Sequence, residues 1–227
     1  MIKEAGNRLA GIFVEESRKG KKFFTKNYVK GKTVYTESLV LSGGSEFRSW
    51  DPMKSKLAAA LQKGLAQTYL RVDDKVLYLG ASTGTTPSHV SDIVGKGGHV
   101  FALDFAPRVV RELVFMSENR DNISPIMGDA NKPISYSHLV TGVDFVYMDI
   151  AQKNQSEIFI KNVDLFLKEG GFGMLFVKSK SIDISKRPKQ IYSMVRKDLE
   201  DAGLTIVDFK ELDPFEKDHC IFIVKKK

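Results

Sequence analysis

The chain has 227 residues, of which 42% are hydrophobic and 10% aromatic, so it can build a core and is not disordered by composition. No apolar run reaches the ~18 residues of a membrane span, and the polar start lacks the apolar stretch of a signal peptide. The single cysteine, Cys220, excludes an internal disulfide and a cysteine-based zinc site. The formal charge of +7 lies entirely within residues 1–70, which suggests a polyanionic partner or, more simply, a solvated lysine-rich surface.

The first part of the chain is typical of a small β module. Residues 8–50 are rich in β-branched and aromatic residues and are punctuated by turn signals at Lys19-Gly20, Lys30-Gly31 and Gly43-Gly44. Short strands are predicted at 12–14, 22–24, 33–35 and 39–41. We therefore expect an antiparallel β module over residues 1–53, followed by an amphipathic helix over 55–67.

The remainder, residues 54–227, is predicted to form an α/β domain, because apolar strands alternate with helical segments from Lys75 onward. The expected strands are 76–79, 100–103, 123–127, 143–148 and 174–177, and the expected helices lie near 86–94, 107–119, 132–140, 153–168 and 189–202. Two late strands, 204–209 and 220–224, are joined by a linker too short for a crossover helix and should be antiparallel. The pattern predicts a mostly parallel seven-stranded sheet with an antiparallel C-terminal strand.

The first strand-to-helix turn of this domain, residues 80–86, has the character of a nucleoside-binding turn. Gly80 and Gly84 allow close backbone approach, although a plain tight turn would also explain them. Asp104 ends the second strand, where a carboxylate can accept hydrogen bonds from two ribose hydroxyls. The turn is not G-x-G-x-x-G and has no phosphate-loop lysine. A nucleoside without a pyrophosphate fits best, and S-adenosylmethionine (SAM) is the candidate.

Two further strand ends carry acids. Asp129 with Ala130 closes the third strand, and Asp149, followed by Gln152, closes the fourth. A single acid at such a position is often only a helix N-cap. Acids at three successive strand ends favour a common ligand crevice instead.

At this point the chain resembles the fibrillarin family, the SAM-dependent RNA 2′-O-methyltransferases of box C/D ribonucleoproteins. The resemblance runs from about residue 25 to the C-terminus and rests on residues 77–92, 107–113, 149–152, 177–183 and 214–219. Asp104 stands where the family usually has Glu, and Lys153 replaces the usual Pro. The Gly/Arg-rich N-terminal tail of eukaryotic members is absent, so the chain resembles the archaeal-type rRNA/tRNA 2′-O-methyltransferase and a cytoplasmic location is expected.

The resemblance implies a Rossmann-like SAM-dependent methyltransferase fold, SAM as cofactor, no metal, and a set of site residues. The implied SAM-binding residues are Gly80, Ala81, Gly84, Thr85, Thr86, Asp104, Phe105, Asp129, Ala130, Asp149 and Gln152. The implied catalytic residues are Lys56, Asp149, Lys178 and His219.

A chemical hypothesis follows for the catalytic set. Lys178 would accept or orient the proton of a ribose 2′-hydroxyl, and the nearby ammonium of Lys56 would favour its neutral form. Asp149 would offset the excess positive charge and fix the Lys178 ammonium, while His219 would orient the ribose or pass on the proton. The alternatives are a surface lysine at 56, a lysine stem along apolar surface at 178, and a structural histidine at 219.

The resemblance also implies partners: a box C/D guide RNA that selects the target rRNA or tRNA, a Nop-domain scaffold protein and a kink-turn-binding ribosomal protein, with no membrane. Lys180, Lys186, Arg187 and Lys189 would contact phosphates or would only form a solvated loop. Two other functions stay open: a SAM methyltransferase acting on a protein glutamine or a small molecule, and a non-enzymatic RNP component with a vestigial fold.

Overall fold

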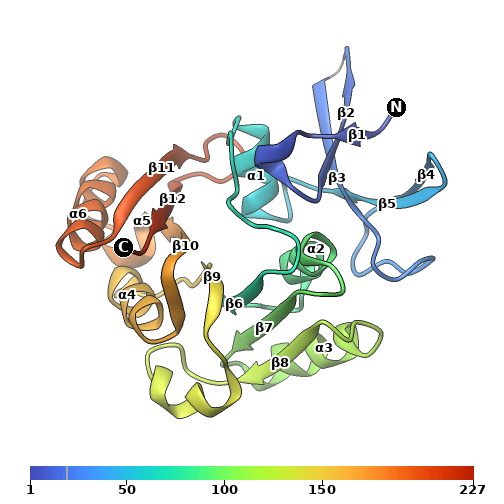
Figure 1. The fold of residues 1–227 in the computed structure, drawn as a ribbon. Coiled ribbons are helices and arrows are strands. Elements are labelled where there is room, and N and C mark those ends of the chain that lie inside the picture. Colours follow the sequence, from blue (N-terminus) through green and yellow to red (C-terminus); the bar gives the residue numbers. More distant parts are fainter. Residues whose placement is uncertain (19) are drawn as a thin grey trace.

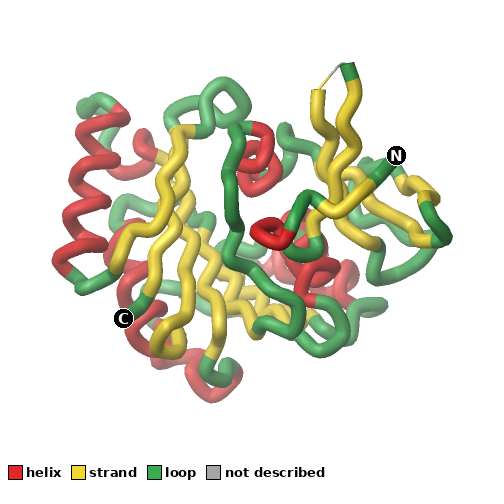
Figure 2. The backbone as a smooth tube through the Cα atoms, turned by 45° about the horizontal axis from the view of Figure 1, so that its top comes forward, coloured by secondary structure: helices red, strands yellow, loops and turns green. Residues whose placement is uncertain are grey.

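The computed structural model describes residues 1–18 and 20–227 and contains two β-sheets that stand side by side (Figures 1 and 2). The smaller sheet has five antiparallel strands in the order β1-β2-β3-β5-β4, which confirms the expected antiparallel module. Its strands are β1 (Lys3–Glu4), β2 (Ile12–Ser17), β3 (Gly20–Lys26), β4 (Leu39–Ser42) and β5 (Ser45–Trp50), with a 3₁₀ turn at Asn7–Leu9.

The strand expected at 33–35 is wrong. The backbone amides of Val34 and Tyr35 both donate to the Glu37 carboxylate, at 2.8 Å each, and residues 34–36 form bends. β5 takes that place in the sheet and pairs with β3 and β4. The turns at Lys30-Gly31 and Gly43-Gly44 are present, whereas Lys19 of the expected Lys19-Gly20 turn lies outside the described residues.

The connecting helix α1 spans Lys56–Gln62 and is shorter than the expected 55–67. Ser55 is its N-cap, and its side chain accepts from the Ala58 amide. The helix ends at Gln62 with Lys63 as its C-cap, because Gly64 follows with a φ of 79°, a left-handed conformation that terminates helices.

The larger sheet has seven strands in the order β11-β12-β10-β9-β6-β7-β8. The five strands from β10 to β8 are parallel, and β12 is antiparallel to both β10 and β11, as the sequence predicts. The bounds are β6 (Lys75–Leu79), β7 (His99–Asp104), β8 (Ile123–Met127), β9 (Val143–Met148), β10 (Leu167–Lys178), β11 (Thr205–Glu211) and β12 (His219–Lys225).

Both faces of this sheet are covered, because alternate strand residues enter two different hydrophobic clusters. Tyr78 of β6 packs toward α1, α2 (Thr85–Val94) and α3 (Pro107–Ser117), whereas Leu77 packs toward α4 (Gln155–Phe166) and α6 (Pro188–Asp201). The helix expected near 132–140 is instead a 3₁₀ segment, Pro133–Leu139, and the short α5 (Ser179–Ile182) was not expected.

The two sheets are joined by a shared core and by buried charges. Ile12, Phe23 and Trp50 of the small sheet belong to the same hydrophobic cluster as β6. Beside it lies a buried ion network, here called the Arg48 network, consisting of Arg48, Glu37, Asp92 and Arg120. Arg48 is 0% exposed and pairs with Glu37 at 2.7 Å and Asp92 at 2.8 Å, and Asp92 also accepts from Arg120 at 2.7 Å. The expected boundary between residues 53 and 54 stays a prediction.

Two further observations bear on the sequence expectations. Among the described residues, no helix has the length and apolarity required to cross a membrane. Cys220 is 0% exposed and lies on β12, between β10 and β11, and burial raises the pKa of its thiol.

Candidate functional site

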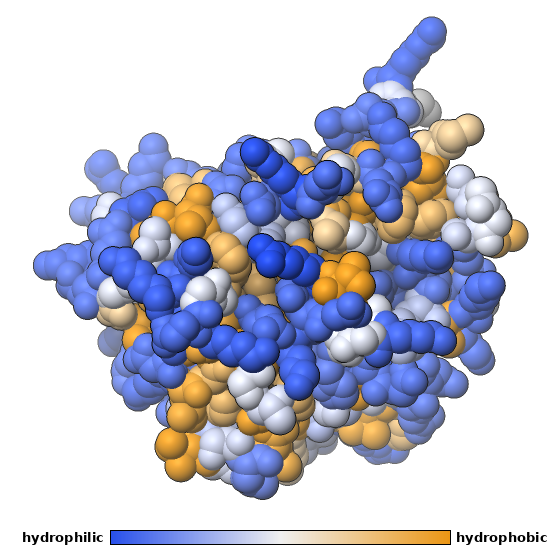
Figure 3. Space-filling model, viewed as in Figure 1, coloured by the Kyte–Doolittle hydropathy of each residue, from blue (hydrophilic) through white to orange (hydrophobic). Residues whose placement is uncertain are grey.

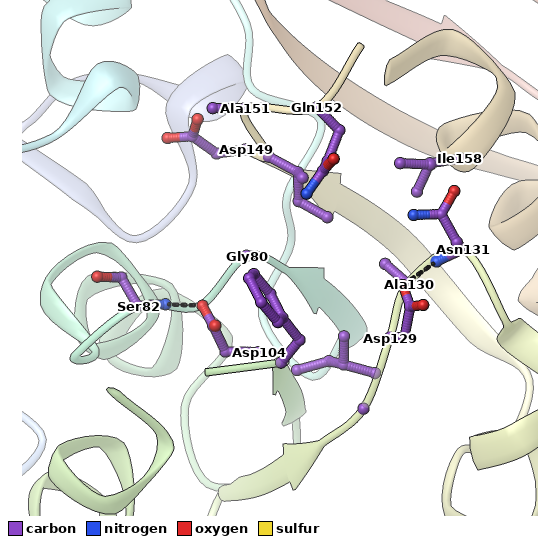
Figure 4. Close-up of a pocket in the computed structure, with 14 residues that line it drawn as sticks. Gly80, Ser82, Asp104, Asp129, Ala130, Asn131, Asp149, Ala151, Gln152 and Ile158 are labelled. Carbon is purple, nitrogen blue, oxygen red and sulfur yellow. Dashed lines mark hydrogen bonds between the residues drawn. The ribbon is translucent and has the colours of Figure 1, made fainter. Parts of the chain in front are cut away.

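A cavity of about 320 Å³ opens where β6, β7, β8 and β9 end at the carboxyl edge of the larger sheet (Figure 4). Ligands bind at this edge in open α/β sheets. The turn after each of the four strands contributes to the wall, and α4 closes one side with Ile158. The cavity is therefore built by residues that are far apart in sequence and that only the strand order brings together.

The turn after β6 needs its glycines. Gly80 has a φ of 83°, and a Cβ there would lie 2.3 Å from the carbonyl oxygen of Asp149. Gly84 has a φ of 96° and would meet the Met116 side chain at 2.3 Å. The turn thus lets the backbone after β6 pass directly beside the backbone after β9, and a side chain would block that approach.

Asp104 is held in place by two backbone amides. Its carboxylate accepts from the Ser82 amide at 2.9 Å, as Figure 4 shows, and from the Ala106 amide at 3.1 Å. A carboxylate oxygen has two lone pairs, so both oxygens can still accept from a ligand in the cavity. Phe105, which follows it, is 66% exposed at the cavity wall. An acid beside an exposed aromatic ring matches the ribose and base of a nucleoside.

Seven of the expected SAM-binding residues line the cavity: Gly80, Asp104, Phe105, Asp129, Ala130, Asp149 and Gln152. Four others do not. Ala81 is buried behind the turn, and Gly84 caps α2. Thr85 faces a second hollow, of about 510 Å³, between the 29–35 loop and α3, and Thr86 donates its hydroxyl hydrogen to Ser55 at 3.0 Å.

Sequence reasoning missed several wall residues, namely Ser82, Leu103, Gly128, Asn131, Ile150, Ala151 and Ile158. Most of them are sequence neighbours of expected residues in the same four turns, so a prediction that included every residue of each turn would contain them. Ile158 comes from α4 and carries no such signal, because its place depends on how that helix packs.

Lys56 and Asp149 form a close ion pair at the rim. The Lys56 ammonium donates to both carboxylate oxygens of Asp149, each at 2.8 Å, and the two side chains are 22% and 26% exposed. The expectation that Asp149 fixes the Lys178 ammonium is therefore corrected: Asp149 pairs with Lys56, and among residues 1–18 and 20–227 the Lys178 ammonium has no ion pair. This pairing also offsets the charge with which Lys56 was expected to repel Lys178.

Beneath the pair lie two stacked tyrosines, Tyr78 and Tyr147, with ring centroids 4.1 Å apart. Burial raises the pKa of both phenols well above the ordinary value, and the negative charge of Asp149 adds to the effect. Both side chains remain neutral phenols at physiological pH. The two tyrosines near Asp149 therefore carry no charge, and the cation that pairs with Asp149 is Lys56.

Lys178 and His219 are neighbours across the β10–β12 ladder, at the same sheet edge. The Lys178 side chain is exposed, whereas His219 is 8% exposed. His219 Nδ1 lies 2.7 Å from the Lys217 carbonyl oxygen, which can only accept, so Nδ1 carries the proton. This leaves Nε2 as the second ring nitrogen, which has no hydrogen-bond partner among the described residues. Neither residue lines the cavity itself.

One other histidine, His89, has a structural environment. His89 is 0% exposed between the hydroxyls of Thr25 and Tyr35, and it stacks on Trp50. Burial, reinforced by Arg48 and Arg120, holds its pKa well below the usual range, so it is a neutral structural residue. Among residues 1–18 and 20–227, no group of His, Cys, Asp and Glu side chains could hold a metal ion.

Together these features define a class. A mostly parallel seven-stranded sheet with an antiparallel β12, a glycine turn after β6 and an acid after β7 is the fold of the SAM-dependent methyltransferases. The fibrillarin family model matches residues 3–227 of the chain. The chain belongs to the fibrillarin family.

Individual relatives are similar to this chain over nearly its whole length. The chain is 52% identical over 203 residues to the fibrillarin-like rRNA/tRNA 2′-O-methyltransferase of Methanocaldococcus jannaschii, covering 89% of this chain and 88% of the relative. The crystal structure of Aeropyrum pernix fibrillarin with natively bound SAM is 42% identical, with a TM-score of 0.89 and 99% of each chain covered. A fibrillarin/Nop5p complex is 39% identical, with a TM-score of 0.84, covering 94% and 97%.

Proposed function

We propose that this protein is a SAM-dependent RNA ribose 2′-O-methyltransferase that acts on rRNA and tRNA as the catalytic subunit of a box C/D guide RNP. The observation that carries the proposal is a cavity lined by Gly80, Asp104 and Asp149, with Asp149 paired to Lys56, at the sheet edge where Lys178 and His219 also lie. The named activity of the 52% identical relative supports it.

The cavity fits the cofactor. Its volume lies at the lower end of the ~300–1,000 Å³ typical of ligand pockets. Gly80 leaves room for close approach, Asp104 can bind ribose hydroxyls, and Phe105 offers a ring face for adenine. Asp149, at the far end, is an anion suited to a sulfonium. SAM supplies, when bound, a methyl group on that sulfonium.

The remaining residues act on the acceptor ribose. Lys178 Nζ, exposed at the end of β10, holds or accepts the proton of the 2′-hydroxyl. His219, its neighbour across the β10–β12 ladder, orients the ribose through Nε2. Lys56 fixes the rotamer of Asp149 through two hydrogen bonds. The main contribution of this arrangement is alignment, since the methyl donor is already activated.

Partners complete the enzyme. We include a Nop-domain scaffold, because a fibrillarin 39% identical to this chain is found in complex with Nop5p. A guide RNA and a kink-turn-binding ribosomal protein belong to the same proposal, and base pairing would then select the target. On this view the isolated chain binds SAM and methylates bare RNA poorly. The cytoplasmic location expected from the sequence stays a prediction.

The test is an assay of the reconstituted RNP with methyl-labelled SAM. Label should appear in a 2′-O-methylnucleoside at the guide-selected position, and Lys178→Ala should lose at least ~100-fold in rate while SAM binding, measured by calorimetry, is retained. Label on protein, no transfer at all, or a fully active Lys178→Ala would each contradict the proposal.

A further inference from the structure

A buried glutamine lies between the cofactor cavity and Lys178. Gln155 is the first residue of α4 and is 0% exposed. Its amide makes three hydrogen bonds: Oε1 accepts from the Lys178 amide at 3.0 Å, and Nε2 donates to the carbonyls of Lys178 at 3.1 Å and Gln152 at 2.8 Å. Both amide hydrogens are used, and all three contacts go to backbone groups of site segments.

These bonds occupy the place of a missing strand. β9 pairs with β10 as far as Met148 and Leu175, and then leaves the sheet to form the turn that carries Asp149. The N–H and C=O of one strand residue point to the same side, and a neighbouring strand would bond both. The Gln155 amide bonds the N–H and C=O of Lys178 in the same way. It therefore extends the ladder by one side chain beyond the end of β9.

The position of Lys178 depends on its backbone. Among residues 1–18 and 20–227, its ammonium has no hydrogen bond or ion pair, and its side chain is exposed. Lys178 ends β10, so the strand offers no further support beyond it. The same Gln155 amide holds Gln152, three residues after Asp149. One side chain thus sets the spacing between the Asp149 turn and Lys178.

We propose that Gln155 is a positioning residue, which acts through Lys178 by holding its backbone in register with the cofactor turn. The proposal rests on the role of Lys178 given above. A purely structural glutamine would contribute to stability alone, whereas a positioning residue must change kcat through Lys178.

The first experiment uses Gln155→Met in the reconstituted RNP, since methionine keeps the length of the side chain and removes the amide. We expect kcat to fall at least ~10-fold, with KM for RNA within about twofold and SAM affinity within about threefold. The matched control is Asn122→Leu. Asn122 is also buried and makes three amide hydrogen bonds, to Ser91 and Gly95, far from the site. Its variant should lose stability and keep kcat.

The decisive comparison is a double-mutant cycle with Lys178→Ala. In that background, Gln155→Met should change the residual rate less than about twofold, because residues that act as one unit are not additive. A full additional ~10-fold loss would show that Gln155 acts independently, and an unchanged kcat in the single variant would overturn the proposal. If Lys178→Ala were fully active, the proposed function would fail instead, so the two failures are distinguishable.

A second variant covers the case in which Gln155→Met does not fold. Gln155→Glu keeps the acceptor for the Lys178 amide and points an ionised oxygen at two carbonyls. Because burial favours the protonated carboxyl, lowering the pH restores one donor. The ratio of variant to wild-type kcat should therefore rise as the pH falls from about 8 to about 6. A flat ratio, or a loss confined to KM for SAM, would contradict the positioning role.

Discussion

At the scale of single residues, the feature with the clearest chemical meaning is the pair of two equal 2.8 Å bonds between Lys56 and Asp149. Asp149 lines the cavity, while Lys56 is the first residue of α1. The Ser55 hydroxyl, which caps α1, accepts from Thr86 at the start of α2. The start of the helix that carries Lys56 is thus bonded to the start of α2, and the Lys56 ammonium holds the Asp149 carboxylate through two hydrogen bonds.

The corresponding prediction concerns Lys56→Met, which keeps the apolar stem and removes the ammonium. Single-turnover methylation by the RNP should fall about 100-fold, the loss that a misplacement near 1 Å produces. SAM affinity, measured by calorimetry, should stay equal or become tighter, because Asp149 then lacks its counter-ion and favours another cation. Lys63→Met, at the exposed other end of α1, is the control and should stay within about twofold. Loss of SAM binding in Lys56→Met would contradict this account.

At the scale of elements, the predicted and observed secondary structure agree where a strong local sequence pattern determines the element. The apolar strands from β6 to β10 and the antiparallel β11–β12 pair follow from short hydrophobic runs and linker length. The failures have a common physical reason. Residues 33–35 have the composition of a strand, but the amides of Val34 and Tyr35 donate to the Glu37 carboxylate. The strand β5 is not predicted because its buried Arg48 interrupts the apolar pattern. At 33–35, hydrogen bonds to the nearby Glu37 carboxylate, which is itself paired with the buried Arg48, outweighed local strand propensity.

The same limit explains which site residues were predictable. Strand ends are visible in the sequence, so Asp104, Asp129 and Asp149 were found with their turns. Gln155 and Ile158 lie on a helix, and their contacts with β10 and the cavity depend on packing. The pairing of Asp149 with Lys56 rather than Lys178 likewise depends on how α1 docks, which no local pattern specifies.

The element-scale prediction concerns the Arg48 network, which fastens the small sheet to α2. Arg48→Met would leave Glu37 and Asp92 buried without this partner, and removing one member of a buried ion network costs about 3–5 kcal/mol. Urea unfolding should show that loss. Lys161→Met, which breaks the exposed pair with Glu157, is the matched control and should cost about 0.5 kcal/mol or less. Equal effects of the two changes would refute the idea of a buried anchor.

At the scale of the whole molecule, positive charge is distributed around the site rather than gathered in the cavity. Hydrophilic side chains cover much of the face in Figure 3, between scattered apolar groups. The loop from Asp183 to Arg187 follows β10 and α5 at the carboxyl edge of the larger sheet, and it carries the exposed side chains Lys186 and Arg187. Its place suits contact with the phosphates of a bound RNA duplex.

The whole-molecule prediction is a salt dependence. Replacing Lys186, Arg187 and Lys189 with Ala should lower the slope of log affinity against log salt by about 0.7–0.9 for each lost phosphate contact. The control removes the same charge at the opposite sheet edge, with Lys75, Lys96 and Lys225 replaced by Ala. RNA binding of the two assembled RNPs is compared over a salt series. An unchanged slope in the first variant would mean that the loop is only solvated.

The burial of Cys220 has a practical consequence. It is the only cysteine in the chain, it is 0% exposed, and its strand is bonded on both sides. The thiol lies in the hydrophobic cluster that the sheet forms with α6, so a thiol reagent can reach it only when the packing of α6 on this face of the sheet opens. Because His219 precedes Cys220 directly, the modification rate reports how often the α6 packing opens over this end of β12, in the free chain and in the assembled particle, without an introduced cysteine.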